Sequence, residues 1–385
     1  MKLNTCIIFL LPLILTGCWS KYEVQNINYA TAVGIDFEDS QYILYVQMLD
    51  FSTVAKLEGQ QKSEHPPIWV GIGKGSSMTE AANDLYNTAQ QRMSWGNVSA
   101  IIFSEKLLKA EKVNDVLEFI NRYREVRYIS WLFSTRVPLD ETLMTTAFFR
   151  LSPKATILHN PEQNYKQRSI IPPIRLHQFV LDSNEKAKTS YMPEIGIRSA
   201  QWKENQKPQS MFKYSGIHVY DQDHYYARIN IQNLSGLPWL NKRTIRLPVI
   251  LVNKKNLVAV IVAEKPKYNI KPSVKDNNAY FDVDVEVKAT VNELHQNVSE
   301  NDLSKMAQIE IERQIRHTFQ TAFEQNIDIY NLGETLYRKN PHEWKRLASR
   351  EHHFVLNKQS LRKVNIKVHI AYPQRYKFKE SDISR

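Results

Sequence analysis

The sequence contains a short motif that supports covalent chemistry at a cysteine, formed in order by Leu15, Thr16, Gly17 and Cys18. An aliphatic residue, two small residues and a cysteine form a bacterial lipobox, in which small side chains let the backbone enter the signal peptidase. The cysteine thiol takes a diacylglycerol before cleavage makes this residue the new N-terminus. The order predicts that Cys18 carries the lipid, and an ordinary secretory signal with an accidental cysteine is the alternative.

An apolar run over residues 7–15 precedes the lipobox and follows the positive start of Met1 and Lys2. A helix of about nine residues spans roughly 14 Å, whereas the hydrocarbon core of a bilayer measures roughly 30 Å. The run is therefore too short for a transmembrane helix and is typical of an export signal. We predict a lipoprotein signal peptide over residues 1–17 and a mature chain that begins at Cys18.

The cysteines and the charge limit what the mature chain can do. Cys6 lies in the removed peptide and Cys18 carries the lipid, so disulfides, thiolate catalysis and cysteine–metal sites are excluded. The net charge of +11 favours contact with anionic lipid headgroups or an acidic partner, although charges spread along the chain also fit plain solubility. An exported chain meets little nucleic acid, so we expect no nucleic-acid partner.

The remaining motifs that could carry chemistry do not complete a site. The glycines of residues 71–77, "GIGKGSS", lack the lysine spacing of a phosphate loop and fit a strand-to-helix turn. Asp282, Asp284 and Glu286 share one face of a strand, but calcium prefers ligands from a loop that wraps it. The adjacent histidines 352–353 lack metal-binding spacing, and no nucleophile elbow occurs. We therefore expect no catalytic residue, no metal and no cofactor beyond the covalent lipid on Cys18.

The first stretch of the mature chain, residues 18–150, alternates strand and helix patterns. "YATAVGIDF" and "QYILYVQMLDF" predict a hairpin, and "VSAIIF" and "YISWLFSTRV" predict further strands. Ser77 and Glu80 form a possible capping box that opens a helix to about Met93. These patterns predict an N-terminal mixed α/β domain.

The second stretch, residues 151–245, begins with a segment that has four prolines and no stable period over residues 151–174. Such a segment is typical of a linker or a wrapping loop. A short helix, "LHQFVLDSNEKA", and several β-rich runs follow, and "YDQDHYY" fits a hairpin turn between apolar arms. We predict a linker followed by a β-rich middle domain.

The third stretch, residues 246–375, combines long strands with a long helix. Phe281, Val283, Val285 and Val287 alternate with acidic residues, as in a strand buried on one side. The helix predicted over residues 299–325 has an apolar stripe formed by Leu303, Ala307, Ile311, Ile315, Phe319 and Ala322. The fold class is therefore α+β, with three mixed α/β-type domains in tandem behind the signal peptide and a basic tail over residues 376–385.

Three segments resemble the Ger(x)C family, the lipoprotein subunit of nutrient germinant receptors in spore-forming bacteria. They are "GCWSKYEVQNINYATAVGIDF", "YSGIHVYDQDHYYARINIQNLSGLPWL" and "IDIYNLGETLYRKNPHEWKRL". The residues that carry the resemblance, and that we take as structural or interface candidates, are Trp19, Asp36, Gly216, Gly236, Asp328, Gly333, Pro341 and Trp344.

The resemblance implies a non-enzymatic role in receptor assembly and in the triggering of spore germination. It implies a lipid anchor on the outer face of the inner spore membrane and two partners, a polytopic transporter-like subunit and a second membrane subunit. Two other classes stay open. A substrate-binding lipoprotein of a membrane transporter would have two similar lobes around a cleft, and a lipoprotein hydrolase would need a nucleophile or a metal motif.

Overall fold

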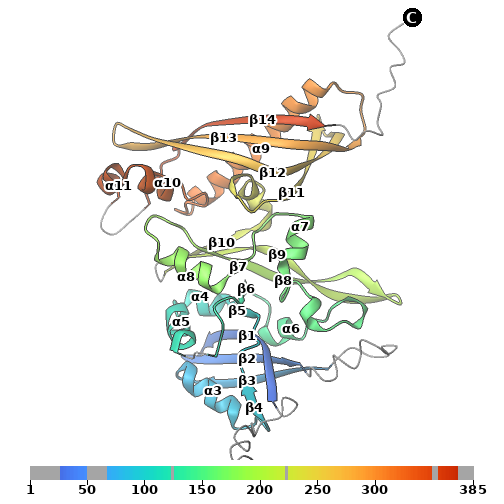
Figure 1. Cartoon of the computed structure of the whole chain (residues 1–385), viewed down its shortest axis with the longest axis vertical. Coiled ribbons are helices and arrows are strands. Elements are labelled where there is room, and N and C mark those ends of the chain that lie inside the picture. Colours follow the sequence, from blue (N-terminus) through green and yellow to red (C-terminus); the bar gives the residue numbers. More distant parts are fainter. Residues whose placement is uncertain (1–26, 50–66, 123–124, 222–223, 349–353, 372–385) are drawn as a thin grey trace, which may run out of the picture.

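Two β-sheets, stacked along the long axis of the molecule, organise the chain (Figure 1). The computed structural model describes residues 27–49, 67–122, 125–221, 224–348 and 354–371. The first sheet has the strand order β10-β9-β8-β6-β5-β1-β2-β3, with β4 paired to β1 and β7 paired to β6. The second sheet has the order β11-β12-β13-β14. The mixed α/β class predicted from the sequence is confirmed.

The first sheet takes its strands from both the N-terminal and the middle stretch of the chain. Its strands are β1 (Ile27–Glu38), β2 (Gln41–Leu49), β3 (Ile68–Gly75), β4 (Arg92–Ser94), β5 (Ala100–Ser104), β6 (Trp131–Thr135), β7 (Ile174–Arg175), β8 (Tyr191–Glu204), β9 (Lys207–Asp221) and β10 (His224–Asn230). Its helices are α3 (Met78–Tyr86), α4 (Glu105–Lys109), α5 (Val113–Arg122), α6 (Leu139–Leu143), α7 (Pro161–Gln167) and α8 (Leu176–Asn184), with short 3₁₀ turns η2 (Phe148–Arg150) and η3 (Pro153–Ala155). Because β8, β9 and β10 extend this sheet, the middle stretch has no separate sheet, and the exact domain boundaries stay predictions.

The N-terminal hairpin forms as predicted, with β1 and β2 antiparallel, and β1, β5 and β6 run parallel. Helix α3 also begins as predicted, because the Ser77 hydroxyl accepts a hydrogen bond from the Glu80 backbone N–H at 3.2 Å. Its predicted end near Met93 is wrong: the helix stops at Tyr86, and β4 pairs in parallel with the start of β1. Pairing with β1 buries Met93, so tertiary contact overrides the local helical pattern.

The proline-containing segment over residues 151–174 is partly helical. Pro161 is the first residue of α7, where its missing N–H and its fixed φ suit the start of a helix. Ser169, just after α7, is fully buried, and its hydroxyl donates to the Tyr165 carbonyl at 2.8 Å. The segment is therefore packed against the rest of the chain, as the second of the two predicted alternatives, a wrapping loop, would be.

The second sheet is built as the alternating pattern predicts. It contains β11 (Arg246–Asn253), β12 (Asn256–Lys275), β13 (Asn278–Leu294) and β14 (Leu361–Ala371), with helices α9 (Glu300–Phe323), α10 (Leu332–Lys339) and α11 (Pro341–Leu347). Phe281, Val283, Val285 and Val287 on β13 are all buried. Strand β14 runs parallel to β13, so the long connection through α9, α10 and α11 is a crossover.

The structure confirms both the predicted start and the predicted buried face of helix α9. Ser299 is the N-cap, and its hydroxyl accepts a hydrogen bond from the Asp302 N–H at 3.2 Å. The six stripe residues predicted from Leu303 to Ala322 are buried in the core. Over the part of the chain that the structure describes, no helix combines the length and the apolar character that a membrane span needs.

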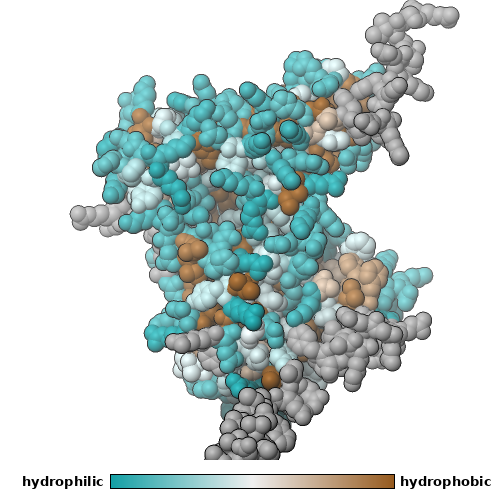
Figure 2. Space-filling model, viewed as in Figure 1, coloured by the Kyte–Doolittle hydropathy of each residue, from teal (hydrophilic) through white to brown (hydrophobic). Residues whose placement is uncertain are grey.

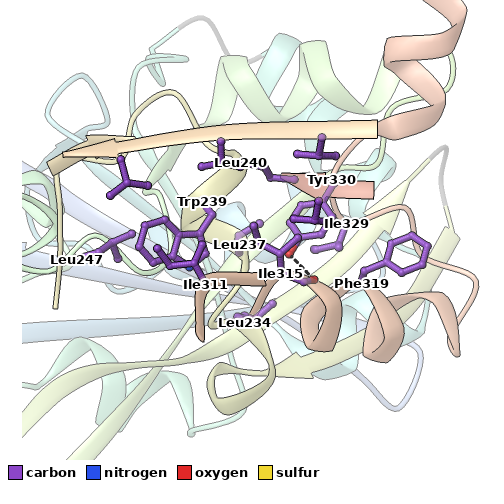
Figure 3. Close-up of a cluster of buried hydrophobic side chains, with 14 of the residues drawn as sticks. Leu234, Leu237, Trp239, Leu240, Leu247, Ile311, Ile315, Phe319, Ile329 and Tyr330 are labelled. Carbon is purple, nitrogen blue, oxygen red and sulfur yellow. Dashed lines mark hydrogen bonds between the residues drawn. The ribbon is translucent and has the colours of Figure 1, made fainter. Parts of the chain in front are cut away.

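Residues 231–240, which we call the bridge segment, connect the first sheet to the second. The segment consists of η4 (Ile231–Leu234) and η5 (Leu237–Leu240), and Leu234, Leu237, Trp239 and Leu240 are buried. Figure 3 shows these side chains packed against Ile311, Ile315 and Phe319 of α9 and against Ile329 and Tyr330. The same core continues into strands β9 and β10 of the first sheet, so one hydrophobic cluster joins the two sheets.

Truncation of Ile315 tests this shared core. Ile315 is fully buried on α9, and we expect Ile315→Ala to lower the free energy of unfolding by about 2–5 kcal/mol, because a cavity replaces packed methyl groups. The matched control is Ile309→Ala on the same helix, since Ile309 is 69% exposed and its loss should change stability by at most about 0.5 kcal/mol. Equal denaturant midpoints for the two variants would contradict the placement of Ile315.

Candidate functional site

Gly236 lies where the bridge segment meets helix α9. Its N–H donates a hydrogen bond to the Thr318 hydroxyl at 2.9 Å. A Cβ at this position would overlap the Gln314 carbonyl oxygen and the Tyr330 hydroxyl. The Tyr330 hydroxyl in turn donates to the Ile315 carbonyl at 3.0 Å, as Figure 3 shows. This sequence-predicted residue is therefore a close backbone contact and offers no reactive group.

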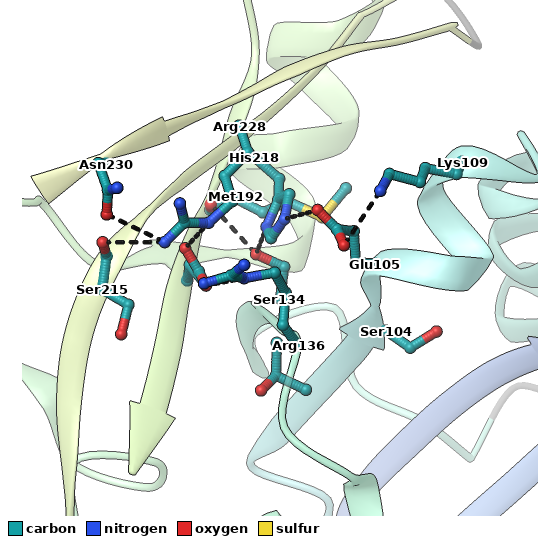
Figure 4. A network of polar contacts seen from close by, with 12 residues as sticks. Ser104, Glu105, Lys109, Ser134, Arg136, Met192, Ser215, His218, Arg228 and Asn230 are labelled. Atoms are coloured by element: carbon teal, nitrogen blue, oxygen red, sulfur yellow. Dashed lines mark hydrogen bonds and ion pairs between the residues drawn. The ribbon is translucent and has the colours of Figure 1, made fainter. Parts of the chain in front are cut away.

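Gly216 lies beneath a buried carboxylate on the first sheet. A Cβ on Gly216 would overlap the Ile229 carbonyl oxygen and would lie 3.1 Å from Glu194 Oε2. The Glu194 side chain is 2% exposed and accepts from Arg136 Nε at 3.0 Å and from Arg228 Nε at 2.6 Å (Figure 4). Two arginines satisfy the buried charge, as a buried carboxylate requires.

A Ser134–His218–Glu105 arrangement adjoins this ion pair (Figure 4). His218 Nδ1 lies 2.8 Å from the Ser134 hydroxyl, and His218 Nε2 lies 3.4 Å from Glu105 Oε1. Serine hydrolases use the same three residue types, but Ser134 and His218 are both fully buried inside the sheet. Burial also lowers the pKa of His218. With no route for a substrate to Ser134, the arrangement serves to join β6, β9 and α4.

Asp328 caps helix α10. Its carboxylate accepts hydrogen bonds from the Leu332 N–H at 2.9 Å and from the Gly333 N–H at 2.6 Å. A Cβ on Gly333 would come within 3.2 Å of the same carboxylate, so the glycine gives the cap room. Burial raises the pKa of Asp328 to about 6, although the two N–H donors act in the opposite direction.

Asn331 extends this cap across the junction between the two sheets. Its backbone is left-handed, with φ of 52°, and its side-chain oxygen accepts from the Thr189 N–H at 2.8 Å. Thr189 belongs to the loop between α8 and β8, on the side of the first sheet. The family-like motif around Asp328 and Gly333 therefore fixes a contact between the two sheets, which no local pattern in the sequence indicated.

A cleft of about 570 Å³ lies beside this contact. The cleft is lined by side chains of α8 and α10 and by residues 188–191, 240–243 and 268–270. The charged residues at the cleft are Asp182, Lys188, Lys242, Arg243, Glu334, Arg338 and Lys339.

Most of these charges already have partners on the cleft wall. Lys188 pairs with Asp182 at 2.8 Å, and Arg338 pairs with Glu334 at 2.8 Å. Lys339 donates to the Ile270 carbonyl at 2.7 Å. Each of these contacts stays on one side of the cleft, and the two sides are connected by the Thr189–Asn331 hydrogen bond and by the Lys188–Glu334 ion pair at 3.8 Å. The cleft is therefore polar, and the nucleophile, base and oxyanion donors of an active site do not converge there.

The remaining candidates have structural positions or lie outside the described residues. Trp344 is buried, with its ring 5.0 Å from that of Tyr337, and Pro341 is the first residue of α11. Asp36 accepts from the Phe37 N–H at 2.8 Å and from the Ser104 hydroxyl. Leu15, Thr16, Gly17, Cys18, Trp19 and histidines 352–353 fall outside the described ranges.

The glycine turn and the acidic strand face are accounted for by packing and pairing. The glycines predicted to form a turn lie within β3 itself, and a Cβ on Gly73 or Gly75 would overlap the backbone of α3 at Ala81, so they let the helix pack against the strand. Asp282 pairs with Arg362 and Asp284 pairs with Lys271. Among the residues that the structure describes, no group of three or more histidine, cysteine or acidic side chains could hold a metal ion.

Comparison with known proteins places the chain in a family. Residues 20–197 match the family described as spore germination protein N-terminal domain, and residues 215–373 match the family described as spore germination B3/GerAC like, C-terminal. The chain is 23% identical to spore germination protein KC of Bacillus subtilis (strain 168) over 357 residues, which cover 87% of each chain. It is also 23% identical to spore germination protein B3 of the same strain over 310 residues, 78% of this chain and 76% of that one.

A solved structure shares the fold. The crystal structure of the GerBC protein superposes with a TM-score of 0.53 at 18% sequence identity, covering 91% of this chain and 99% of that chain. Because the two family domains together span most of the sequence, the chain belongs to the GerAC-like family of spore germination proteins. The resemblance drawn from the sequence motifs is confirmed.

Replacement of Gly236 by alanine tests the close contact with α9. We expect Gly236→Ala to lower the free energy of unfolding by about 1–3 kcal/mol, because the new methyl group must displace the backbone of α9 or of the bridge segment. The control is Gly96→Ala, since nothing lies within 4 Å of a Cβ at Gly96. If chemical denaturation gave both variants the same stability, the bridge contact would not have the role described.

The buried cap predicts a pH dependence of stability. The pKa of Asp328 is raised from 3.8 to about 6 in the folded chain, so ionisation favours the unfolded state. The stability that the protonated Asp328 carboxyl contributes to the fold is fully present below pH 3.8 and is lost as the pH rises through about 6. Relative to Asp328→Asn, the wild-type free energy of unfolding should fall by roughly 2–3 kcal/mol across this window. A difference between the two proteins that stays constant with pH, measured by denaturant titration, would contradict this.

Proposed function

We propose that the chain is a lipid-anchored, non-enzymatic subunit of a spore nutrient germinant receptor. The observation that carries the proposal is the match of both spore germination family domains, in order, to residues 20–197 and 215–373. The lipobox at Leu15–Thr16–Gly17–Cys18 supports attachment through a diacylglycerol to the outer face of the inner spore membrane. Its role there is to assemble with a polytopic transporter-like subunit and a second membrane subunit, and to let nutrient trigger germination.

The burial of the Ser134–His218–Glu105 arrangement supports the non-enzymatic part of the proposal, because a hydrolase needs an accessible nucleophile. The unlike sheets weigh against a substrate-binding lipoprotein of a transporter, since one sheet has ten strands and the other has four. The GerAC-like fold instead supplies a rigid body with cross-sheet contacts at Gly236 and Asn331, which suits a subunit that holds partners in place.

The anchor and the receptor role can be tested in spores. Deletion of the gene should abolish the response to at least one member of a panel of single amino acids, sugars and nucleosides. Complementation with wild type should restore that response. Complementation with Cys18→Ala should leave an unlipidated precursor. Because two acyl chains attach a protein far more firmly than one or none, the unlipidated chain should restore only a weak response.

Two controls make the outcome clear. A Cys6→Ala chain should label with lipid and germinate like wild type, because Cys6 lies in the removed peptide. Immunoblots of the membrane fraction separate loss of anchoring from loss of protein. Deletion spores that respond normally to the whole panel would overturn the receptor role, and equal lipid labelling of Cys18→Ala would overturn the anchor.

A further inference from the structure

Five apolar side chains gather on the surface of the first sheet's unit. They are Met144 (52% exposed), Phe148 (41%), Phe149 (85%), Leu151 (39%) and Trp202 (52%), and we call them the aromatic patch. Figure 2 shows apolar side chains gathered on this flank of the molecule, where Figure 1 places α6 and the far ends of β8 and β9. Their exposure does not contribute to folding, so another role must account for it.

The three aromatic rings of the patch lie against one another at the surface. The ring centroids of Phe148 and Trp202 lie 5.0 Å apart at an interplanar angle of 75°, although the two residues come from η2 and β8. The rings of Phe148 and Phe149 lie 5.9 Å apart. Phe149 has a left-handed backbone with φ of 57°, a conformation that is unfavourable for a residue with a Cβ. The fold therefore holds Phe149 outward at a conformational cost.

Hydrogen bonds place Met144, the first residue of the patch, near the start of β1. Gln47 Nε2 donates to the Leu143 carbonyl at 2.6 Å, directly before Met144. The Thr31 hydroxyl donates to Gln47 Oε1 at 2.9 Å. Thr31 lies only four residues after Ile27, the first residue of β1. Met144 thus lies near the N-terminal part of β1, and the patch extends from there to Trp202 on the β8–β9 hairpin.

The length of chain before β1 brings this side close to the bilayer. This step depends on the proposed function, because it takes Cys18 as the lipid anchor. About nine peptide units separate Cys18 from Ile27, and in any conformation they reach at most about 32 Å. Ile27, and with it the nearby start of the patch at Met144, therefore stays within a few nanometres of the headgroups.

The charge around the patch complements an anionic surface. Lys203 and Lys207 are exposed at the end of the β8–β9 hairpin, with Lys207 on the same face as Trp202 and Lys203 on the opposite face. Asp140 and Glu141 of α6 are also exposed, so the cations lie at the hairpin end of the patch. Arg150 follows Phe149 and forms an ion pair with Glu204 at 3.5 Å. Exposed aromatic and aliphatic side chains flanked by cations are typical of segments that enter the membrane interface. The net charge of +11 also favours contact with an anionic surface.

We propose that the aromatic patch inserts into the interface of the anionic membrane that holds the anchor, and so fixes how the two sheets stand on the bilayer. The lipid then acts as a tether, and the patch acts as a second contact that removes rotational freedom.

Vesicle binding tests the proposal without the anchor. A chain that begins at Trp19, which keeps every described residue, should co-float with phosphatidylglycerol vesicles more than with phosphatidylcholine vesicles, and less at high salt. Phe149→Ser combined with Trp202→Ser should weaken partitioning into the phosphatidylglycerol vesicles by about tenfold. The matched control is Ile309→Ser, which removes an equally exposed apolar side chain (69% exposed) from α9 of the other unit and should bind like wild type.

Each outcome of the flotation assay supports or overturns the proposed membrane contact. Undiminished flotation of the double variant, at an unchanged melting temperature, would overturn the proposal, as would an equal loss in the Ile309→Ser control. If the double variant unfolds, the single variant Trp202→Ser is tested instead, and it should also bind phosphatidylglycerol vesicles more weakly than wild type. Normal flotation together with loss of a receptor subunit on pull-down would make the patch a protein interface and would also overturn the proposal. Failure of the receptor role shows only in the germination assay, so the two failures are distinguishable.

Discussion

The close backbone contact at Gly236 is the constraint on which the two-sheet arrangement depends. The bridge segment leaves β10 of the first sheet and immediately reaches α9, which covers the second sheet. Its N–H bond to Thr318 and the Tyr330 hydroxyl beside it leave no room for a side chain. Trp239 is fully buried next to this point, and its Nε1 donates to Gln314 Oε1 at 2.8 Å. One helix face therefore orients both sheets.

Other ties between the sheets also use backbone groups. The Ser169 hydroxyl accepts from the Ile245 N–H at 3.1 Å and from the Arg246 N–H at 3.2 Å, directly before β11. Asn331 accepts from the Thr189 N–H on the other side of the cleft. The ion pair between Lys188 and Glu334, at 3.8 Å, adds little by comparison, because ion pairs near the surface are weak and screened by salt. The junction is thus held by directional bonds that define one geometry.

The sequence predicts those features of the fold that depend on local period. The buried face of α9 and the alternation on β13 follow from spacings of three, four and two residues, and both are confirmed. The buried network around Glu194 could not be found this way, because Arg136 lies 58 residues from it and Glu105 lies 113 residues from His218. In the sequence, only Gly216 pointed to this network. A glycine within a strand indicates that another group approaches the backbone closely, but it does not identify that group.

Three glycines of the family-like motifs share one physical property. Gly216, Gly236 and Gly333 each bring the backbone against an oxygen atom, from Ile229, Gln314 and Asp328 respectively. A hydrophobic core accepts substitutions that conserve volume, whereas such a contact accepts only a residue without a Cβ. Motifs made of glycines and a buried carboxylate therefore identify this fold well and say little about its chemistry. What distinguishes the function of this chain must be sought on its surface, where one flank carries exposed aromatic side chains and the junction between the sheets carries a polar cleft.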